Sequence, residues 1–460
     1  MSDCSLFRTL LSEALEDRLN DGIRHALNLG AFGAEVFVSI SNSNRAKVQN
    51  GKIQDLSTSK RGGLGVRVLR SGCNGLRTGI ATTTDFTKEN FFELFTQAWQ
   101  LSALGDEDCW IRQADPSGSD DLPSRYNQAC NDLTSEQRIQ FAMSLEEEAR
   151  AASTKVSAIR EAAWTDGTGV ELLLTQKGVR AYNLVSSCCA SIELAVTEDG
   201  DRQAAWHWGL ARNPEDINLR AIGHEAVAKG EIKLKPSRMT SGRYAIILHP
   251  EVTVEVFSLV ALMLSASAAL KGKSLFANKV GEPIASDLLT LIDDGRMANG
   301  FGSTPWDGEG LPTRKNVLIQ DGVLMTHLHT LKTAAEMNVA PTSSANRGIG
   351  SNPYVATFNL FPKPGSQNTN ELYQLAGNGV LITDIMGLHT VNPVSGDLSV
   401  GACGVMIRGG ALAESIDRIT LACNLKDFLT KIVALGDDLK WYGNNAGLSL
   451  LLEDISLGGA

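Results

Sequence analysis

With 460 residues, the chain is long enough to form two or three domains with sizeable cores. Hydrophobic residues at 43% and charged residues at 20% are typical of a soluble globular protein. The net charge of -10, together with the lack of a basic patch, argues against a nucleic-acid-binding surface, because phosphate binding requires clustered Lys and Arg side chains.

Three features predict a soluble protein of the cytoplasm. The N-terminus carries acidic residues where a signal peptide would have a basic flank and an unbroken apolar core. The longest apolar run, residues 256–270, is shorter than the ~20 residues needed to cross a bilayer. The eight cysteines form no CxxC pairs, which favours reduced thiols. We therefore expect no contact with a membrane or with nucleic acid.

The N-terminal half shows helical and strand patterns in alternation. Alternating apolar residues punctuated by NG, GG and SG pairs predict consecutive hairpins, first over residues 34–83 and again over 157–200. An acidic stretch with Pro and Ser, residues 106–129, indicates a long surface connection. Apolar residues at helical spacing predict three helices in this half, over residues 6–29, 86–104 and 135–152.

A fourth helix closes this half. Asn213 is a plausible N-cap, Pro214 suits the first turn, and Gly230 stands just past the expected end. The stretch that follows contains Pro236 and indicates a linker. We therefore place the main domain boundary near Pro236.

Beyond that linker, Gly-rich strands and loops dominate, and helices are expected only in the apolar run and over residues 424–435. The regular βαβ rhythm of a parallel sheet is missing. The sequence therefore predicts an α+β fold with two domains. Residues 1–235 form antiparallel hairpins with flanking helices, and residues 236–460 form a β-dominated domain with a few helices.

The stretch HEAVAKGE, residues 224–231, begins like the HExxH helix of a zinc protease. Zinc would need a second ligand one turn after His224, but Val, Ala and Lys occupy positions 227 to 229. His224 is expected at the edge of the helix's apolar stripe, with Glu225 rotated about 100° away. An ordinary amphipathic helix explains this stretch better than a metal site.

A second candidate follows an apolar strand, where His249 precedes Glu251 and Glu255. Glu251 and Glu255 are four residues apart and share a helix face, so the three side chains could bind a divalent metal. Helix-start chemistry is the alternative explanation, because Pro250 and nearby acids suit the first turn of a helix.

The remaining histidines give weaker signals. His327 and His329 are expected on one side of a strand without a third ligand, and His389 is a loop residue of unknown role. His207 stands between two tryptophans, as in an edge strand or an aromatic cluster. No GxSxG, GxGxxG or GxxxxGK[ST] motif occurs, so the sequence alone shows no complete catalytic constellation.

Several blocks in a fixed order nevertheless make the chain recognisable. They comprise the hairpin region at residues 45–83 and four C-terminal blocks at residues 303–337, 342–348, 382–410 and 419–429. Taken together, these blocks resemble the TldD/PmbA family of cytoplasmic proteins associated with metal-dependent proteolysis. The resemblance extends over nearly the whole chain.

The resemblance also identifies the position of the family's metal site. In the TldD branch, a strand leads into HExxxH, whose histidines bind zinc and whose glutamate is the general base, and a late cysteine is a third ligand. The matching segment here keeps His249, but Pro250 replaces the glutamate and Val254 replaces the second histidine. No cysteine follows Cys423. Proline and valine can neither coordinate zinc nor carry a proton.

This degenerate site implies the PmbA (TldE) branch, whose members lack the metal. The expected role is that of a non-catalytic subunit, with no catalytic residue and no cofactor of its own. Its partner would be a zinc-bearing TldD-type subunit in a heterodimer, and homodimers are possible when that partner is absent. The implied substrates are unfolded peptides and peptide precursors, held extended by strand addition.

Two alternatives stay open. The chain could be an active metallopeptidase with a rearranged site, either His249, Glu251 and Glu255 or the pair His327 and His329. It could also be a peptide-binding or regulatory protein without a protease partner, since the broader family is linked by name to modulation of DNA gyrase.

Overall fold

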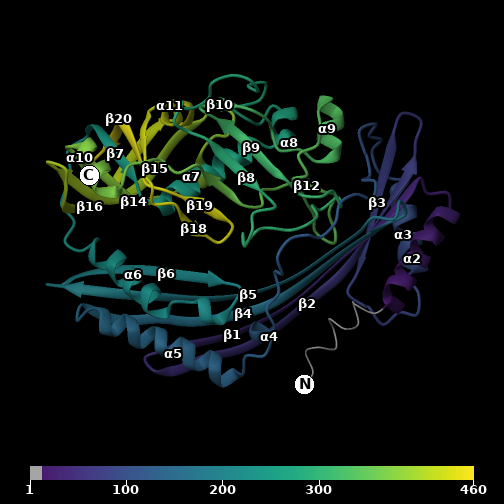
Figure 1. Ribbon diagram of the computed structural model, residues 1–460, viewed down its shortest axis with the longest axis horizontal. Helices are drawn as coiled ribbons and strands as arrows, with labels where there is room; N and C mark the ends of the chain where they lie inside the picture. The colour runs from purple at the N-terminus through teal and green to yellow at the C-terminus, as the bar shows by residue number, and fades with distance from the viewer. Residues whose placement is uncertain (1–12, 460) are drawn as a thin grey trace.

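The computed structural model describes residues 13–459, and it forms two β-rich layers (Figure 1). The lower layer in Figure 1 is one antiparallel sheet with the strand order β3-β2-β1-β4-β5-β6. The predicted hairpins are therefore confirmed. The strands of this sheet are β1 (Gly33–Gln49), β2 (Lys52–Ser71), β3 (Leu76–Thr83), β4 (Val156–Thr175), β5 (Arg180–Glu198) and β6 (Asp201–Ala211).

Tight turns set the register of these long strands. Asn50 and Gly51 join β1 to β2, and Asp199 and Gly200 join β5 to β6, all four with positive φ. Such two-residue turns match the right-handed twist of antiparallel strands, which is why NG and DG pairs favour them. In β4 and β5, alternate residues are consequently buried along most of each strand.

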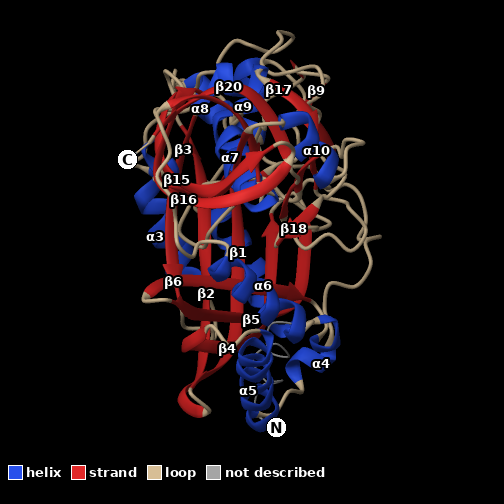
Figure 2. Ribbon diagram, turned by 90° about the vertical axis from the view of Figure 1, so that its left-hand side faces the viewer, coloured by secondary structure: helices blue, strands red, loops and turns tan. Residues whose placement is uncertain are grey.

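Helices cover one face of this sheet in two groups. The helices α2 (Glu13–Asn28) and α3 (Phe92–Ser102) pack on β1 and β2 at one end, and α5 (Ser135–Ala152) and α6 (Leu219–Glu231) pack on β4 and β5 at the other. A short helix, α4 (Gln128–Asn131), precedes α5. Figure 2 shows α4 and α5 at the end of the molecule farthest from β17 and β20, with α6 above them. The helix predicted from residue 6 is confirmed over α2, and its first residues lie outside the described part of the chain.

The upper layer holds two further six-stranded sheets with a few helices, as expected for the C-terminal half. In one of them β16 pairs with both β15 and β20, which closes five strands into a barrel, and β17 continues from β20. The members of this sheet are β7 (Gly242–Leu248), β14 (Gly379–Met386), β15 (Asp397–Arg408), β16 (Ala411–Asn424), β17 (Ile432–Leu435) and β20 (Leu450–Gly458).

The other sheet packs beside this barrel and has both parallel and antiparallel pairs. It comprises β8 (Leu291–Asp294), β9 (Lys315–Gln320), β10 (Val323–Leu324), β13 (Leu360–Pro362), β18 (Lys440–Tyr442) and β19 (Asn445–Gly447), and a small hairpin adds β11 (Ala345–Asn346) and β12 (Tyr354–Val355). The helices of this half are α7 (Pro250–Met263), α8 (Ala266–Leu270), α9 (Leu331–Met337), α10 (Thr369–Ala376) and α11 (Leu425–Thr430). The predicted α+β class is confirmed. Within residues 13–459, no helix combines the length and the apolar character needed to cross a bilayer.

The two layers are joined by a tight contact near β1 and β2. A Cβ atom at Gly65 would lie only 1.5 Å from the carbonyl oxygen of Ile349, so glycine is required where this loop crosses β2. Beside it, the buried Glu35 carboxylate accepts hydrogen bonds from Arg67 at 2.7 Å and from Arg347 at 2.8 Å. This ion triad joins a residue of the upper layer to the lower sheet.

Several sequence predictions about local structure were wrong in detail. The helix expected from Asn213 begins five residues later, because Pro214 starts a separate 3-10 turn and Asn218 is the N-cap of α6. Gly230 lies inside α6 rather than beyond it. The helix predicted over residues 424–435 ends at Thr430, and β17 follows it. His327 and His329 lie in an extended segment outside the named strands.

The chain passes between the two layers through residues 232–241, after α6 and before β7. This stretch includes Pro236, at which the sequence predicts the boundary between residues 1–235 and 236–460. That division stays a prediction.

Candidate functional site

The two histidine-containing segments picked out from the sequence, residues 224–231 and 249–255, meet at one pocket. This pocket has a volume of about 230 Å³ and lies between α6, the start of α7 and strand β14. Its wall is partly apolar and partly charged. It is lined by Trp206, Glu225, Ala228, Lys229, Ile232, Lys233, His249, Glu251, Tyr373, Leu381, Thr383, Asp384 and Leu412.

His249 stands where β7 ends and α7 begins. Its imidazole Nδ1 accepts the backbone N–H of Glu251 at 3.3 Å, which makes His249 the N-cap of α7, and Pro250 occupies the first helical position. Burial lowers the pKa of His249, so its imidazole is neutral at neutral pH. In this structure His249 therefore serves as a helix cap.

The first turn of α7, where the family has its second histidine, packs closely against β19. Val254, one turn beyond Pro250, is aliphatic and half-buried. The backbone of β19 passes directly over this turn, so that a Cβ atom at Gly447 would lie 2.1 Å from the Pro250 carbonyl oxygen and 2.9 Å from the Val254 nitrogen. A bulkier segment could not approach α7 at this point without moving its first turn.

A lysine from α6 occupies the polar side of the pocket. The Nζ atom of Lys229 forms an ion pair with Glu251 and lies 3.1 Å from Nδ1 of the buried His207. Burial, and then the charge of Lys229, lower the pKa of His207 to about 4, so its imidazole is neutral and accepts this hydrogen bond. The ammonium group thus binds a carboxylate and an imidazole, the kinds of group that would otherwise bind a metal ion.

Other ion pairs surround this lysine. Lys440 lies 3.5 Å from Glu225, and the Nζ atom of Lys233 lies 3.0 Å from Asp384. With the Lys229 pair, three cations face three carboxylates across the boundary between the two layers. The pocket is therefore close to neutral in charge, and the carboxylates named here already have cationic partners.

The alternative metal ligands do not come together. Glu251 is engaged by Lys229, while Glu255 is exposed on α7. Across residues 13–459, no three His, Cys, Asp or Glu side chains are grouped so that they could hold a metal ion. The pair His327 and His329 is buried with ring centroids 6.5 Å apart.

Two further histidines are exposed. His389 lies exposed in a 3-10 turn, and His224 is exposed on α6. His224 does not lie at the edge of the apolar stripe as predicted, because the buried face of α6 contains Ile222, Gly223, Ala226, Val227 and Gly230. Glu225 and Lys229 are directed toward the pocket instead.

A larger cavity lies next to this pocket, between β6 and the C-terminal half. Its volume is about 680 Å³, and four chain segments line it. These segments are residues 122–127, 207–213, 297–303 and 440–443, and Asp216 completes the lining. The predicted surface connection therefore forms one wall of a cavity.

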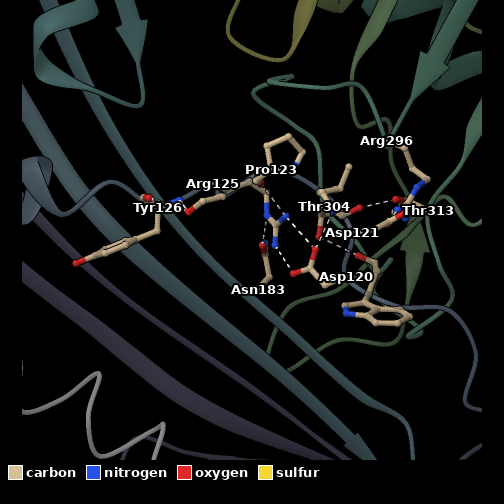
Figure 3. Close-up of polar contacts among 12 residues, drawn as sticks. Asp120, Asp121, Pro123, Arg125, Tyr126, Asn183, Arg296, Thr304 and Thr313 are labelled. Atoms are coloured by element: carbon tan, nitrogen blue, oxygen red, sulfur yellow. Dashed lines mark hydrogen bonds and ion pairs between the residues drawn. The ribbon is translucent and has the colours of Figure 1, made fainter.

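Figure 3 shows how this connection is held. The Arg125 guanidinium donates to Asn183 on β5 at 3.0 Å and to both carboxylate oxygens of Asp120. The next residue, Asp121, forms an ion pair with Arg296 of the C-terminal half. The connection is thus fastened to both layers at the mouth of the cavity.

Arg212, just after β6, holds three walls of the cavity together. Its guanidinium donates to backbone carbonyls of Arg125, Ser186, Gly300 and Phe301 and lies over the Phe301 ring at 4.7 Å. These carbonyls belong to the connection, to β5 and to the loop at residues 297–303. The connection, β5 and this loop are therefore tied together by one half-buried cation.

Lys229 and Arg212 do not stand out in the sequence, and His207 is noticed there only for the tryptophans on either side of it. The pair Glu225 and Lys229 has the ordinary spacing of two exposed helix residues. Their role depends on where α7 and β18 pack, which is set by contacts distant in sequence.

Comparison with known proteins shows which family has this architecture. Models of the PmbA/TldA metallopeptidase domain 1, central domain and C-terminal domain match residues 34–102, 129–234 and 241–459. The chain belongs to the PmbA/TldD metallopeptidase family. The expected family membership is confirmed.

Individual relatives are similar over nearly the full length. Metalloprotease PmbA of Escherichia coli is 24% identical over 453 residues, covering 97% of each chain. TldE from Thermococcus kodakarensis has the same fold, with a TM-score of 0.84 at 19% identity, covering 97% of this chain and all of the other. A Thermotoga maritima protein described as a candidate modulator of a DNA gyrase gives a TM-score of 0.88 at 23% identity, covering 96% of this chain and all of the other.

Proposed function

We propose that this PmbA/TldD family member is the non-catalytic subunit of a two-subunit metallopeptidase of the cytoplasm. The observation that carries the proposal is the environment of His249. Pro250 and Val254 stand at the positions of the family's base and second histidine, and the Lys229 ammonium is paired with the nearest carboxylate, Glu251. A fixed cation there disfavours a second one, because like charges at short range repel strongly in a partly buried site.

The family's zinc chemistry would then belong to a TldD-type partner. Zinc bound there would activate a water molecule and polarise the scissile carbonyl. This chain would complete the peptide-binding chamber with its open sheet face. Along β4 and β5 that face presents small or polar half-buried residues, among them Thr165, Gly167, Ser187 and Ser191. Such a surface suits unfolded peptides of varied sequence, because it offers few side chains that would select among them.

A reconstitution experiment tests this proposal. The chain is purified alone and together with a family member that has intact HExxxH and the late cysteine, and zinc content and cleavage of an unstructured peptide are measured. We expect zinc and chelator-sensitive cleavage only in the pair. Stoichiometric zinc with chelator-sensitive cleavage by the chain alone would refute the proposal and favour a rearranged metal site.

A pair of matched substitutions assigns the chemistry to one subunit. His249→Ala in this chain should leave zinc content and cleavage by the pair unchanged, apart from the loss of a helix cap worth about 1 kcal/mol of stability. Replacement of the glutamate in the partner's HExxxH by glutamine should abolish cleavage. Loss of zinc from the pair through His249→Ala would instead place a ligand in this chain.

A gain-of-function experiment examines the pocket directly. Pro250→Glu with Val254→His restores two of the three missing side chains, yet we expect no stoichiometric zinc while the Lys229 ammonium stays. Adding Lys229→Met removes that charge and should increase zinc binding. Equal zinc binding with and without Lys229→Met would show that the lysine does not oppose the metal.

A further inference from the structure

Strand β6 is an edge of the lower sheet, and its outer side faces the larger cavity. The hairpin closed by Asp199 and Gly200 pairs β5 with β6, and Glu198 stands opposite Asp201 in the register. In this register the odd-numbered residues of β6 direct their N–H and C=O groups to β5. The even-numbered residues direct theirs outward.

Those outward groups lack a protein partner where they meet the cavity. Trp208 and Leu210 line it, and among the described residues no hydrogen bond is formed by their backbone N–H or C=O groups. Beyond the end of β6 the situation changes, because the Arg125 carbonyl accepts the N–H of Ser186 on β5. The cavity therefore begins where the sheet has an open edge and ends where the connection closes it.

The walls of the cavity fit an extended chain. Aromatic side chains Trp208, Phe301, Trp441 and Tyr442 line it, while the cations Arg125 and Arg212 are already bound to carboxylate, amide or carbonyl oxygens. A volume of about 680 Å³ is within the range of about 300–1,000 Å³ of ordinary ligand sites. The backbone donors and acceptors of β6 thus stand beside aromatic rings, in a lining that also holds Asp216 and the Glu225-paired Lys440.

We propose that the β6 edge at Trp208 and Leu210 binds one segment of an unfolded peptide as an added antiparallel or parallel strand. This inference rests on the proposed function, in which the chain lines a peptide chamber, and it names the element that holds the peptide. About five extended residues span the edge within the cavity, at about 3.3 Å per residue. Main-chain hydrogen bonds supply the affinity, and the aromatic rings favour uncharged side chains.

Peptide binding to the chain alone tests the proposal. Fluorescence anisotropy of a fluorescein-labelled octapeptide of alternating Thr and Ala gives the Kd. Leu210→Pro removes one outward N–H inside the cavity and should weaken binding about five- to tenfold, the effect of one hydrogen bond. Ala204→Pro is the matched control, because it removes an outward N–H on the same edge beyond the cavity lining. Its Kd should stay within twofold of the wild-type value.

Two further measurements separate main-chain recognition from packing. Leu210→Ala keeps the N–H and should weaken binding less than Leu210→Pro. The same octapeptide methylated on its four central amide nitrogens should bind the wild-type chain at least tenfold more weakly than the parent peptide. This comparison uses only the wild-type chain, so it tests the proposal even if Leu210→Pro fails to fold.

The outcomes are distinct from those of the reconstitution experiment. Absence of binding of the parent octapeptide, equal affinity of the methylated peptide, or equal effects of the two proline substitutions would each overturn the β6 proposal. None of them bears on which subunit carries zinc. Conversely, zinc in the chain alone would refute the non-catalytic role without affecting the measured peptide affinities.

Discussion

The buried triad between the two layers gives the sharpest test of how this fold is stabilised. We expect Glu35→Gln to destabilise the protein strongly at pH 7, because it leaves the guanidiniums of Arg67 and Arg347 facing a neutral amide in a buried site. Removing one partner of a buried ionic cluster typically costs about 3–5 kcal/mol. The Gln113 amide, which also donates to Glu35, does not replace the lost charge.

The structure supports this magnitude independently through the pKa of Glu35. Burial acts to raise this pKa, but the charges of Arg67 and Arg347 and the hydrogen bonds from Gln113 and Arg347 lower it from 4.5 to about 2. That difference corresponds to about 3 kcal/mol of folding free energy. Because the folded-state pKa is the lower one, this stabilisation is complete above pH 4.5. It is lost as the pH falls toward 2, and about half is gone near pH 3.

Urea unfolding followed by tryptophan fluorescence at several pH values measures both effects. The cost of Glu35→Gln should be about 3 kcal/mol or more at pH 7 and should shrink steadily below pH 4.5. The control is Glu414→Gln, which removes the exposed ion pair with Arg408 and should cost less than about 1 kcal/mol. A Glu35→Gln cost below 1 kcal/mol, or one that does not vary with pH, would refute the reasoning.

Two further predictions concern close packing and a buried acid. Gly65→Ala should destabilise the protein by more than about 3 kcal/mol or separate the layers, because its Cβ would meet the Ile349 carbonyl oxygen. Gly169→Ala is the control, because a Cβ atom there meets only ordinary contacts at 3.4 Å or more. Equal unfolding midpoints for the two variants would contradict this. Burial raises the pKa of Asp293 from 3.8 to about 7, although its carboxylate accepts the Phe358 N–H. Its contribution to stability is therefore complete below pH 3.8 and lost as the pH rises through 7. Asp293→Asn should accordingly increase the free energy of unfolding by about 2 kcal/mol more at pH 8 than at pH 5. If the free energies of unfolding of the two proteins run parallel against pH, Asp293 does not titrate in this range.

The sequence predicts the hairpin sheet well because its signals are local. The NG and DG turns and the alternation of apolar residues depend only on neighbours within a few positions. The glycines of residues 62–65 are turn signals in the sequence, but Gly65 lies inside β2, where its missing side chain lets the backbone of Ile349 approach the strand. That function depends on a loop almost 300 residues away, which no local pattern records.

Helix ends were predicted less accurately than helix positions. Asn213 and Pro214 form a legitimate capping pattern, yet the chain makes a single 3-10 turn there and Asn218 caps α6 instead. Both asparagines are chemically capable caps, and the packing of Ile222 and Val227 against the sheet decides between them. The predicted position of His224 at the edge of the apolar stripe was wrong for the same reason. Packing against the sheet decides which face of α6 is buried.

The meeting of α6 with α7 changes the meaning of both histidine segments. Residues 224–231, which begin like a zinc-protease helix, supply the Lys229 ammonium to the pocket that His249 also lines. Without Lys229, Glu251 and His207 would be unpaired polar groups in a half-buried place, at a cost in folding free energy. The lysine satisfies both and joins the two layers by an ion pair at the same point. In the proposed non-catalytic role no metal ion is available to the polar side chains of this pocket, and the Lys229 ammonium takes its place as the partner of the Glu251 carboxylate and the His207 imidazole.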